Sequence, residues 1–533
     1  MIKKITYILL LIVSLVRAQA PTVGLLFLDN NVSEGYTLFT PEVNYSVYLI
    51  NNCGEKVNEW TFTEFPGATC YLLENGTLLR AGRNMLEIRD WDNTVLWNYE
   101  MNANGLNQHH DIEPLPNGNI LCIVRDSYSN TEIIAQGKDP LKVDQVIDLD
   151  KIVELKPIGT NQAEIVWEWK FIDHIIQDYD SSKANFGVIE NHPERIDINY
   201  VDSNIESLDR GYTHVNGIDY NANLDQIIIS ARNLNEIYII DHSTTTAEAA
   251  GHTGGYSNLG GDLLWRWGNS RVYKQGGVED QKLFSQHDVK WVEPGYLDEG
   301  KISVFSNGSD QTRVYSTVHL LNTEMSGTTY TKENNTFKPL DFNWSWSGDI
   351  LENPMYETIK SGAHSLPNGN FIICQSSLGQ VSEITKAGEH VWTYKNPSGN
   401  SIFNQFDNIS QNFNPIFRAE KYPSNYIGLS GKDLTPKGLI ENENSFSSVC
   451  ATLSVAQIEI DNIRVINPVT GHVLKFNQKI ELDALRIMDI NGRVVFSSKN
   501  FSNDHVLINT QSGFYFIEFE KEKIIKRIKI IVK

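Results

Sequence analysis

Residues 362–397 read GAHSLPNGNFIICQSSLGQVSEITKAGEHVWTYKNP. Short β-branched runs alternate here with turn signals such as Pro-Asn-Gly, which is typical of an antiparallel meander of four short strands. Such a meander cannot bury both of its faces alone. Because radial stacking of similar sheets into a β-propeller is the usual solution, this stretch predicts one blade.

Related units recur along the chain, several of them ending in a Trp-containing strand such as DLLWRWGN (262–269). Further copies begin at CYLLENGTLL (70), HHDIEPLPNGNIL (109), GYTHVNGIDY (211) and QHDVKWVEPG (286). A sixth unit can be assembled from residues 418–431 and 46–62, which would close the ring and remove an open edge. We therefore expect an all-β fold, with a six-bladed propeller over residues 21–434.

Composition allows one large folded unit with appendages. The chain has 533 residues, 41% hydrophobic and 21% charged, which is ordinary for a globular protein. Its net charge of -21 and pI near 5.1 argue against nucleic acid as a partner, since phosphate binding needs clustered Lys and Arg. An anionic ligand would have to be bound by a few cations placed locally in a pocket.

The two ends of the chain carry targeting signals. Residues 1–20 combine Lys3 and Lys4, an apolar stretch and an Ala-x-Ala ending, and predict a cleaved signal peptide. No other run is apolar enough for a transmembrane segment. After a polar linker over 435–457, residues 458–533 alternate as short strands and predict a small β-sandwich.

This C-terminal part resembles the sorting domain of the type IX secretion system. The resemblance lies in Asn467-Pro468, the turn Asp489-Ile-Asn-Gly-Arg493, Gly513-Phe-Tyr515 and the Lys-rich last strand, whereas Ile466 replaces the family's usual Pro. It implies export through the periplasm, the type IX machinery as a partner of residues 458–533, and a secreted or cell-surface protein. A carbohydrate-binding or dimerisation module is the alternative.

Five cysteines are too few for a disulfide-dense scaffold. Cys53 and Cys70 are the closest pair in the sequence, and either a short disulfide or two buried thiols would fit them. Cys122 and Cys374 lie within apolar runs and are expected to pack in the core.

Three histidines occupy matching contexts where the innermost strand of a blade would begin: His110, His214 and His287. Innermost strands line the axis of a propeller, so the three imidazoles should face one cavity. Arg232, at the end of the next strand after His214, adds a guanidinium that needs an anion to bind. Zn²⁺ bound by the three histidines is the alternative, but no metal or other cofactor is expected.

These residues, with the spaced polar positions and the repeat over 45–430, resemble the bacterial arylsulfate sulfotransferases that use no nucleotide sulfate donor. The resemblance implies a six-bladed propeller that transfers a sulfuryl group from a phenolic sulfate ester to a phenol by ping-pong transfer through a sulfohistidine. It assigns the nucleophile to His287, and the sulfuryl oxygens to His110, His214 and Arg232. Asn216 is a further candidate for substrate binding, and His109 would replace His110 if the register is shifted by one.

Other interpretations remain. The same cationic pocket could belong to a non-catalytic surface propeller that binds anionic glycans or a protein partner. A quinoprotein-like oxidoreductase shares Trp-rich blades but lacks a recognisable metal-carboxylate set here. Asp111 and Asp288 follow their histidines directly and are expected to be structural, and His364 lies in a different register from His110.

Overall fold

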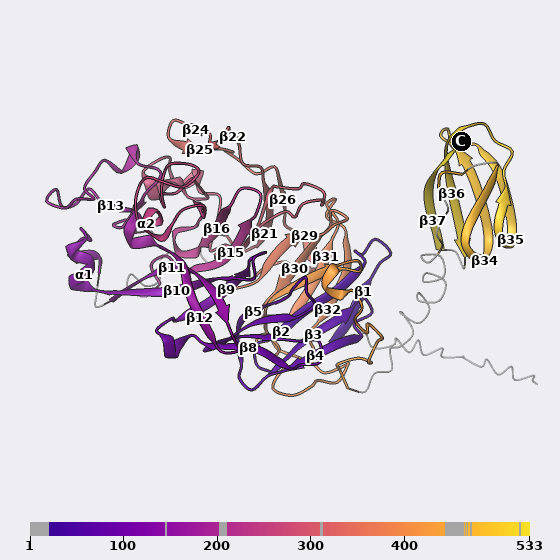
Figure 1. Cartoon of the computed structure of the whole chain (residues 1–533), viewed down its shortest axis with the longest axis horizontal. Helices are drawn as coiled ribbons and strands as arrows, with labels where there is room; N and C mark the ends of the chain where they lie inside the picture. Colours follow the sequence, from indigo (N-terminus) through magenta and orange to yellow (C-terminus); the bar gives the residue numbers. More distant parts are fainter. Residues whose placement is uncertain are drawn as a thin grey trace, which may run out of the picture. The chain divides into compact units, whose positions relative to one another are not determined.

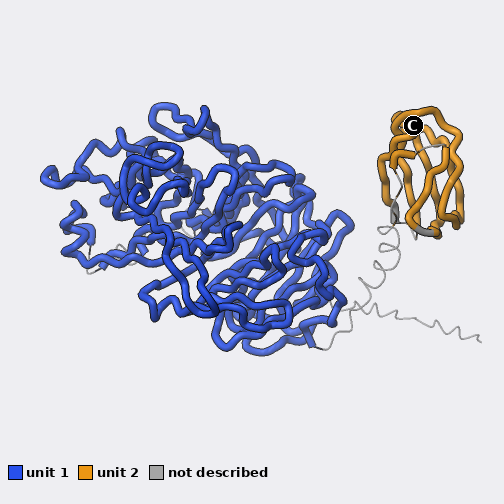
Figure 2. The backbone as a smooth tube through the Cα atoms, viewed as in Figure 1, with its two compact units in different colours: residues 1–443 blue, residues 444–533 orange. Residues whose placement is uncertain are grey.

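The computed structural model describes residues 21–143, 146–201, 211–309, 313–442, 463, 465, 467–469, 472–521 and 524–533. Strands make up most of the regular structure in this part of the chain (Figure 1). Two compact units are present, Met1–Glu443 and Asn444–Lys533 (Figure 2). The expected signal peptide, residues 1–20, lies outside the described residues.

Unit 1 contains, within its described residues, six antiparallel sheets of four or five strands, which we call sheets 1 to 6. Sheet 1 consists of β5 (Pro66–Leu72), β6 (Leu78–Gly82), β7 (Met85–Arg89) and β8 (Val95–Glu100). Sheet 2 consists of β9 (Gln108–Pro114), β10 (Ile120–Ser129), β11 (Val146–Ile158) and β12 (Gln162–Lys170). Sheet 3 consists of β15 (Val215–Asn221), β16 (Gln226–Ala231), β17 (Glu236–Asp241) and β18 (Trp265–Trp267). Sheet 4 consists of β19 (His287–Trp291), β20 (Ile302–Ser306), β21 (Thr317–Leu321) and β26 (Trp344–Trp346). Sheet 5 consists of β29 (Gly362–Ser365), β30 (Phe371–Gln375), β31 (Gln380–Ile384) and β32 (His390–Lys395), with β1 (Gly24–Leu28) at its outer edge. Sheet 6 consists of β33 (Ile416–Pro423), β2 (Gly35–Pro41), β3 (Ser46–Asn51) and β4 (Lys56–Thr61).

The first strands of the sheets form a closed ring. Contacts run from β33 to β5, β9, β15, β19 and β29 in turn, and β30 returns to β33. Sheet 6 joins the two ends of the unit, because β33 pairs with β2 over Gly35↔Pro423 to Pro41↔Ile416. This is the closure that the sequence predicts from residues 46–62 and 418–431, and it gives unit 1 the architecture of a β-propeller.

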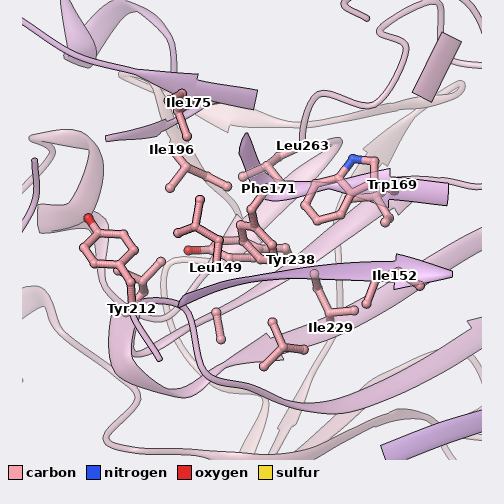
Figure 3. Close-up of a cluster of buried hydrophobic side chains, with 14 of the residues drawn as sticks. Leu149, Ile152, Trp169, Phe171, Ile175, Ile196, Tyr212, Ile229, Tyr238 and Leu263 are labelled. Carbon is pink, nitrogen blue, oxygen red and sulfur yellow. The ribbon is translucent and has the colours of Figure 1, made fainter. Parts of the chain in front are cut away.

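Apolar side chains from neighbouring sheets fill the spaces between them. Figure 3 shows part of the core between sheets 2 and 3, where Ile152 and Trp169 of sheet 2 lie near Ile229 and Tyr238 of sheet 3. All four are at most 1% exposed. Strand β16 is buried along its whole length, with Ile229 in the core shared with sheet 2 and Ile228 in the core shared with sheet 4. Each sheet therefore needs a neighbour on both faces, which is why the repeats are stable only as a stack.

Shorter elements lie in the connections between the strands. They are α1 (Asn130–Ala135), α2 (Thr246–Ala249), β13 (Ile175–Ile176), β14 (Ile196–Asp197), β22 (Met325–Ser326), β23 (Thr329–Tyr330), β24 (Lys332–Glu333), β25 (Thr336–Phe337), β27 (Asp349–Ile350), β28 (Asn353–Pro354), and eight 3-10 turns, η1 (Asn102–Asn104), η2 (Pro140–Lys142), η3 (Phe171–His174), η4 (Ile189–Asn191), η5 (Arg232–Leu234), η6 (Ser270–Tyr273), η7 (Val278–Asp280) and η8 (Ile427–Leu429). No helix among the described residues is long and apolar enough to cross a membrane.

Residues 435–442, the first part of the expected linker, bond to sheet 6. The backbone N–H of Lys437 donates to the carbonyl of Lys56 (2.7 Å), and that of Lys56 donates to Gly438 (2.8 Å). Residues 443–462 lie outside the described part.

Unit 2 is a β-domain whose described strands form one sheet in the order β35 (Val494–Leu507), β34 (Val473–Asp489), β36 (Gly513–Lys521) and β37 (Ile524–Val532). The sequence predicts a sandwich here. Two of its motif elements have clear structural roles. Asn467 Oδ1 accepts from the Ile531 N–H (2.9 Å), and Gly492, with φ 78°, forms the turn that returns from Asp489 to Arg493.

A disulfide between Cys53 and Cys70 is not formed. Cys70 is a free buried thiol, whereas Cys53 is disulfide-bonded to a different partner. Cys70 lies within β5, where its side chain belongs to the core between β5 and its neighbours. Cys122 and Cys374 are also free and buried, which confirms their expected packing role.

Candidate active site

The three predicted histidines lie at the same place in sheets 2, 3 and 4, where an inner strand begins. His110 lies in β9, His214 directly precedes β15, and His287 is the first residue of β19. All three strands have a register irregularity at this point, opposite β10, β16 and β20. A bulge bends a strand and redirects its side chains, so the same distortion turns each of these segments away from a regular ladder.

Backbone strain accompanies the bulges. His110, His214 and Asp288 have φ angles of 58°, 48° and 54°, in the left-handed region that disfavours side chains with a Cβ. Each such residue costs roughly 1–3 kcal/mol, which the surrounding fold must offset. Repetition of the strain in three consecutive sheets indicates that the position of these residues matters more than local stability.

His110 connects a buried carboxylate to the histidine cluster. Its ring centroid is 4.8 Å from that of His214, and its Nδ1 is 2.6 Å from Nδ1 of His109. Nε2 of His109 lies 2.9 Å from Oδ1 of Asp150, which also accepts from the Thr213 hydroxyl through Oδ2 (2.6 Å). Asp150, His109 and His110 thus form one line of side-chain contacts that ends beside His214.

His287 is held in one tautomer by its neighbours. Its Nδ1 lies 2.7 Å from Oδ1 of Asn307 and 3.0 Å from the carbonyl of Ser285. The Asn307 amide group donates to the Lys360 carbonyl (2.8 Å), so its oxygen faces the imidazole. Because both oxygens only accept, Nδ1 carries the proton. Nε2 is left with its lone pair and accepts from the Lys360 N–H (3.1 Å).

Arg232 supplies the positive charge of the cluster. Its backbone N–H donates to the carbonyl of His214 (3.1 Å), which fixes the start of η5 beside β15. Burial and then the charge of Arg232 hold the pKa of His287 well below its usual range, and the same two causes lower the pKa of His214 to about 4. Burial, with His109 and His214 nearby, also lowers the pKa of His110. All three imidazoles are therefore neutral at pH 7.

Arg418, on the closing strand β33, ties the three histidine strands together. Its guanidinium forms an ion pair with Asp111, places Nε 3.1 Å from Oδ1 of Asp288, and donates to the carbonyl of Asn216 (3.3 Å). These partners follow the three histidines by one, one and two positions. Burial opposes ionisation of Asp288, but the Arg418 charge holds its pKa well below its usual range.

The remaining candidates have local partners. Asn216 is fully buried and donates through Nδ2 to the carbonyl of Gln286 (2.8 Å), which positions the residue before His287. His364 lies between Asp288 and Glu420, with ring nitrogens 3.6 Å and 3.4 Å from their carboxylate oxygens. Asp111 and Asp288 are structural, as the sequence predicts, through Arg418.

Sequence reasoning missed four contributors: Asp150, Asn307, Lys360 and Arg418. None of them lies in the histidine contexts of the repeat, because each comes from a different strand or loop. A signal was available for Asn307, which follows β20 directly in the turn Ser-Asn-Gly, and for Arg418, a charged residue within an apolar run.

Residues 60–412 match the model described as Arylsulfotransferase (ASST), which is more than half of the chain. The chain belongs to the arylsulfotransferase family. Residues 467–533 match the secretion system C-terminal sorting domain. The protein is thus an exported arylsulfotransferase, secreted or located at the cell surface.

Similar solved structures show little sequence identity to this arylsulfotransferase. A Bacteroides caccae protein of unknown function is 13% identical, with a TM-score of 0.37, over 73% of this chain and 98% of its own. Catalytically inactive virginiamycin B lyase from Staphylococcus aureus is 8% identical, with a TM-score of 0.33, over 74% and 97%. At these scores neither carries an argument about the site. No curated protein matches the sequence.

Proposed function

We propose that this arylsulfotransferase moves a sulfuryl group from a phenolic sulfate ester to a phenolic acceptor in two steps, through a sulfohistidine at His287. One observation carries the proposal: Nδ1 of His287 is bound by the oxygens of Asn307 and Ser285, which leaves Nε2 as an unprotonated nucleophile in a buried, cationic cluster.

In the first step, Nε2 of His287 attacks the sulfur of the donor. The N–S bond forms as the S–O bond to the phenol breaks, and the donor leaves as a phenoxide. Nδ1–H remains bound to Asn307, where the oxygen of the amide stabilises the positive charge that develops on the ring. The Lys360 N–H, which points at Nε2 before reaction, is then placed to donate to a sulfuryl oxygen.

Arg232 stabilises the negative charge on the sulfuryl oxygens in this proposal. The transferring group spreads negative charge over three oxygens, and a fixed guanidinium in a buried site stabilises that distribution more than it stabilises the ground state. His214, beside Arg232, provides a further ring nitrogen for the sulfuryl oxygens.

The leaving phenoxide needs a proton, and we assign its delivery to Asp150, His109 and His110. In this step His109 starts as the imidazolium, with Nε2–H on Asp150, and passes its Nδ1 proton across the 2.6 Å contact to Nδ1 of His110, while the proton on Nε2 of His110 goes to the leaving oxygen. His109 is then left neutral. In the second step the direction reverses. The acceptor phenol gives its proton to His110, its oxygen attacks the sulfur, and the N–S bond to His287 breaks.

The net reaction exchanges one phenol for another on the sulfuryl group and leaves the enzyme unchanged, so ping-pong kinetics follow. Residues 467–533 support recognition by the type IX secretion machinery as the route of export.

The test is release of a chromogenic phenol from its sulfate ester. With an acceptor phenol, the full-length protein should turn over; without it, release should stop after one equivalent per enzyme. His287→Ala should abolish both phases. His390→Ala is the matched control, because His390 lies in β32 and stacks on Phe27 (4.6 Å) away from the cluster. Absence of release at high protein concentration, or full activity in His287→Ala, would contradict the proposal.

A further inference from the structure

A second group of chemically reactive side chains lies outside the cluster described above. His174 ends η3 after sheet 2, and His252 and Asp262 lie in the connection from β17 to β18 that follows α2. One ligand atom from each lies within 4.8 Å of the others. Among the described residues, these three meet such spacing, whereas His110, His214 and His287 of the candidate active site do not.

The contact between Nδ1 of His174 and Oδ1 of Asp262 requires a cation between the two atoms. Nε2 of His174 lies 2.8 Å from the carbonyl of Ala249, which can only accept, so Nε2 carries the proton. In a neutral ring, Nδ1 then has a lone pair, yet it faces Oδ1 of Asp262 at 2.9 Å. Two atoms with lone pairs attract only through a cation between them, which is either a second proton on the ring or a metal ion.

The second histidine points at the same oxygen. Nδ1 of His252 lies 2.8 Å from Oδ1 of Asp262. A histidine that donates one ring N–H to a backbone carbonyl and presents its other nitrogen to an ion is the usual outer-shell arrangement of metal sites. His174 has this arrangement, with Ala249 as the carbonyl.

Packing holds His174 rigidly. Its ring is fully buried and stacks on Trp169, with centroids 5.2 Å apart and planes at 4°. The Trp169 indole donates to the carbonyl of Gly261 (2.7 Å), and a Cβ on Gly261 would lie only 2.6 Å from Nε2 of His174. Gly261 is thus required for the close approach of the loop, and Trp169 lies in the core drawn in Figure 3.

One side of the group is open. His252 and Asp262 line a cavity of about 280 Å³ together with Arg195. Nε of Arg195 lies 3.7 Å from Oδ2 of Asp262 and balances part of the negative charge on that oxygen. The other oxygen, Oδ1, faces the two histidines. A water molecule or small anion has room in this cavity to complete a coordination shell.

We propose that Nδ1 of His174, Nδ1 of His252 and Oδ1 of Asp262 bind a divalent cation, with Zn²⁺ as the ion that best fits two imidazoles and a carboxylate. Tetrahedral Zn²⁺ with bonds of about 2.0–2.1 Å would separate the ligand atoms by about 3.3 Å. The present separations from Oδ1 need to open by only a few tenths of an ångström. The bound ion would fasten the β17–β18 connection to η3, and hence sheet 3 to sheet 2. This departs from the expectation of no metal and is independent of the proposed function.

The experiment uses full-length protein stripped with a chelator and dialysed. Titration with Zn²⁺ alone should show one site per chain, saturating Zn²⁺ should raise the midpoint of thermal unfolding, and Co²⁺ should give the visible absorption of a tetrahedral N/O site. His252→Ala, which removes a partly exposed ligand without disturbing the core, should weaken Zn²⁺ binding by at least about 10- to 100-fold. Asp262→Asn should do the same.

His192→Ala is the control, because His192 lines the same cavity but pairs with Glu194 (2.8 Å). Unchanged binding in this variant supports the proposed ligand set. Absence of Zn²⁺ binding to the stripped wild-type protein would mean that a proton occupies the site and would overturn the proposal. Equal loss in His192→Ala, or undiminished binding in His252→Ala, would place the ion elsewhere and also overturn it.

Discussion

Nε of Arg418 lies 3.1 Å from Oδ1 of Asp288, and this buried ion pair joins the closing strand of the ring to the residue after His287. The same guanidinium pairs with Asp111, after His110. Because β33 is supplied by the end of the propeller sequence, the spacing of the histidines depends on ring closure. An active arylsulfotransferase is therefore expected only once sheet 6 has formed.

Replacing Arg418 tests this dependence. Arg418→Met leaves Asp111 and Asp288 as buried carboxylates without their cation, which should destabilise the protein by about 3–5 kcal/mol. Urea unfolding monitored by tryptophan fluorescence measures the difference. Adding Asp111→Asn and Asp288→Asn should restore most of the loss. A destabilisation below about 1 kcal/mol in Arg418→Met would show that the ion pairs do not hold the ring.

Removing the charge of Arg232 should change the pH dependence. In the proposed mechanism, Nε2 of His287 must be unprotonated to react. The pKa of His287 is held well below its usual range, so we expect the wild-type rate to stay unchanged as pH falls through the ordinary range of histidine, and to be lost only at lower pH. His287 is faced by Arg232, His214 and Arg418, and the largest charge effect comes from Arg232.

In Arg232→Met the pKa of His287 should therefore rise, which moves the acid limb of the rate profile to higher pH. The maximal rate should also fall by about 10²–10³-fold, the usual effect of removing one oxyanion donor. Arg232→Lys keeps the charge, so its acid limb should stay in place. Identical profiles for the Met and Lys variants would refute the electrostatic role.

The contact between Asn307 and His287 gives a separate prediction. Asn307→Asp places a carboxylate at Nδ1, which should raise the pKa of His287 and move the acid limb upward while the fold is retained. Asn307→Leu leaves only the Ser285 carbonyl to orient the ring, so kcat should fall by about 10- to 100-fold with little change in KM. A rise in KM without a change in kcat would assign Asn307 to substrate binding.

The cysteine assignment predicts a labelling pattern. After unfolding without reductant, alkylation should label Cys70, Cys122 and Cys374 and leave Cys53 unlabelled, because Cys53 is disulfide-bonded. Peptide mapping before and after reduction reads this directly. A Cys53-containing peptide that is alkylated without reduction would contradict the structure.

The sequence predicts the propeller, and the proximity of His110 and His214, because both follow from a repeat. Turn signals and Trp-containing strands mark each sheet, and His110, His214 and His287 share one position within the unit. Residues 46–62 and 418–431 could be joined because neither half makes a complete sheet. A shared position within the repeat thus predicts which side chains face the axis of the ring.

Residues outside the repeat were not predictable in this way. Arg418 lies in strand β33 and Asn307 lies in the turn after β20. Their proximity to His287 therefore depends on how the sheets are arranged in the ring. The left-handed conformations of His110 and Asp288 also have no residue signature, because glycine is absent there. The sequence left a Cys53–Cys70 disulfide and two buried thiols open, and neither describes both residues: Cys70 is a free thiol and Cys53 is disulfide-bonded. Nearness in sequence does not place two thiols on facing strands.

The most direct test of the account is to identify the residue that carries the sulfuryl group. Full-length protein is mixed with an aryl sulfate without acceptor, quenched at alkaline pH where N-sulfonated histidine survives, digested and mapped by mass spectrometry. We predict one sulfuryl group per chain on His287, which disappears when a phenol is added before the quench. A sulfuryl group on another residue, or release of one equivalent of phenol with no covalent adduct, would contradict the central claim.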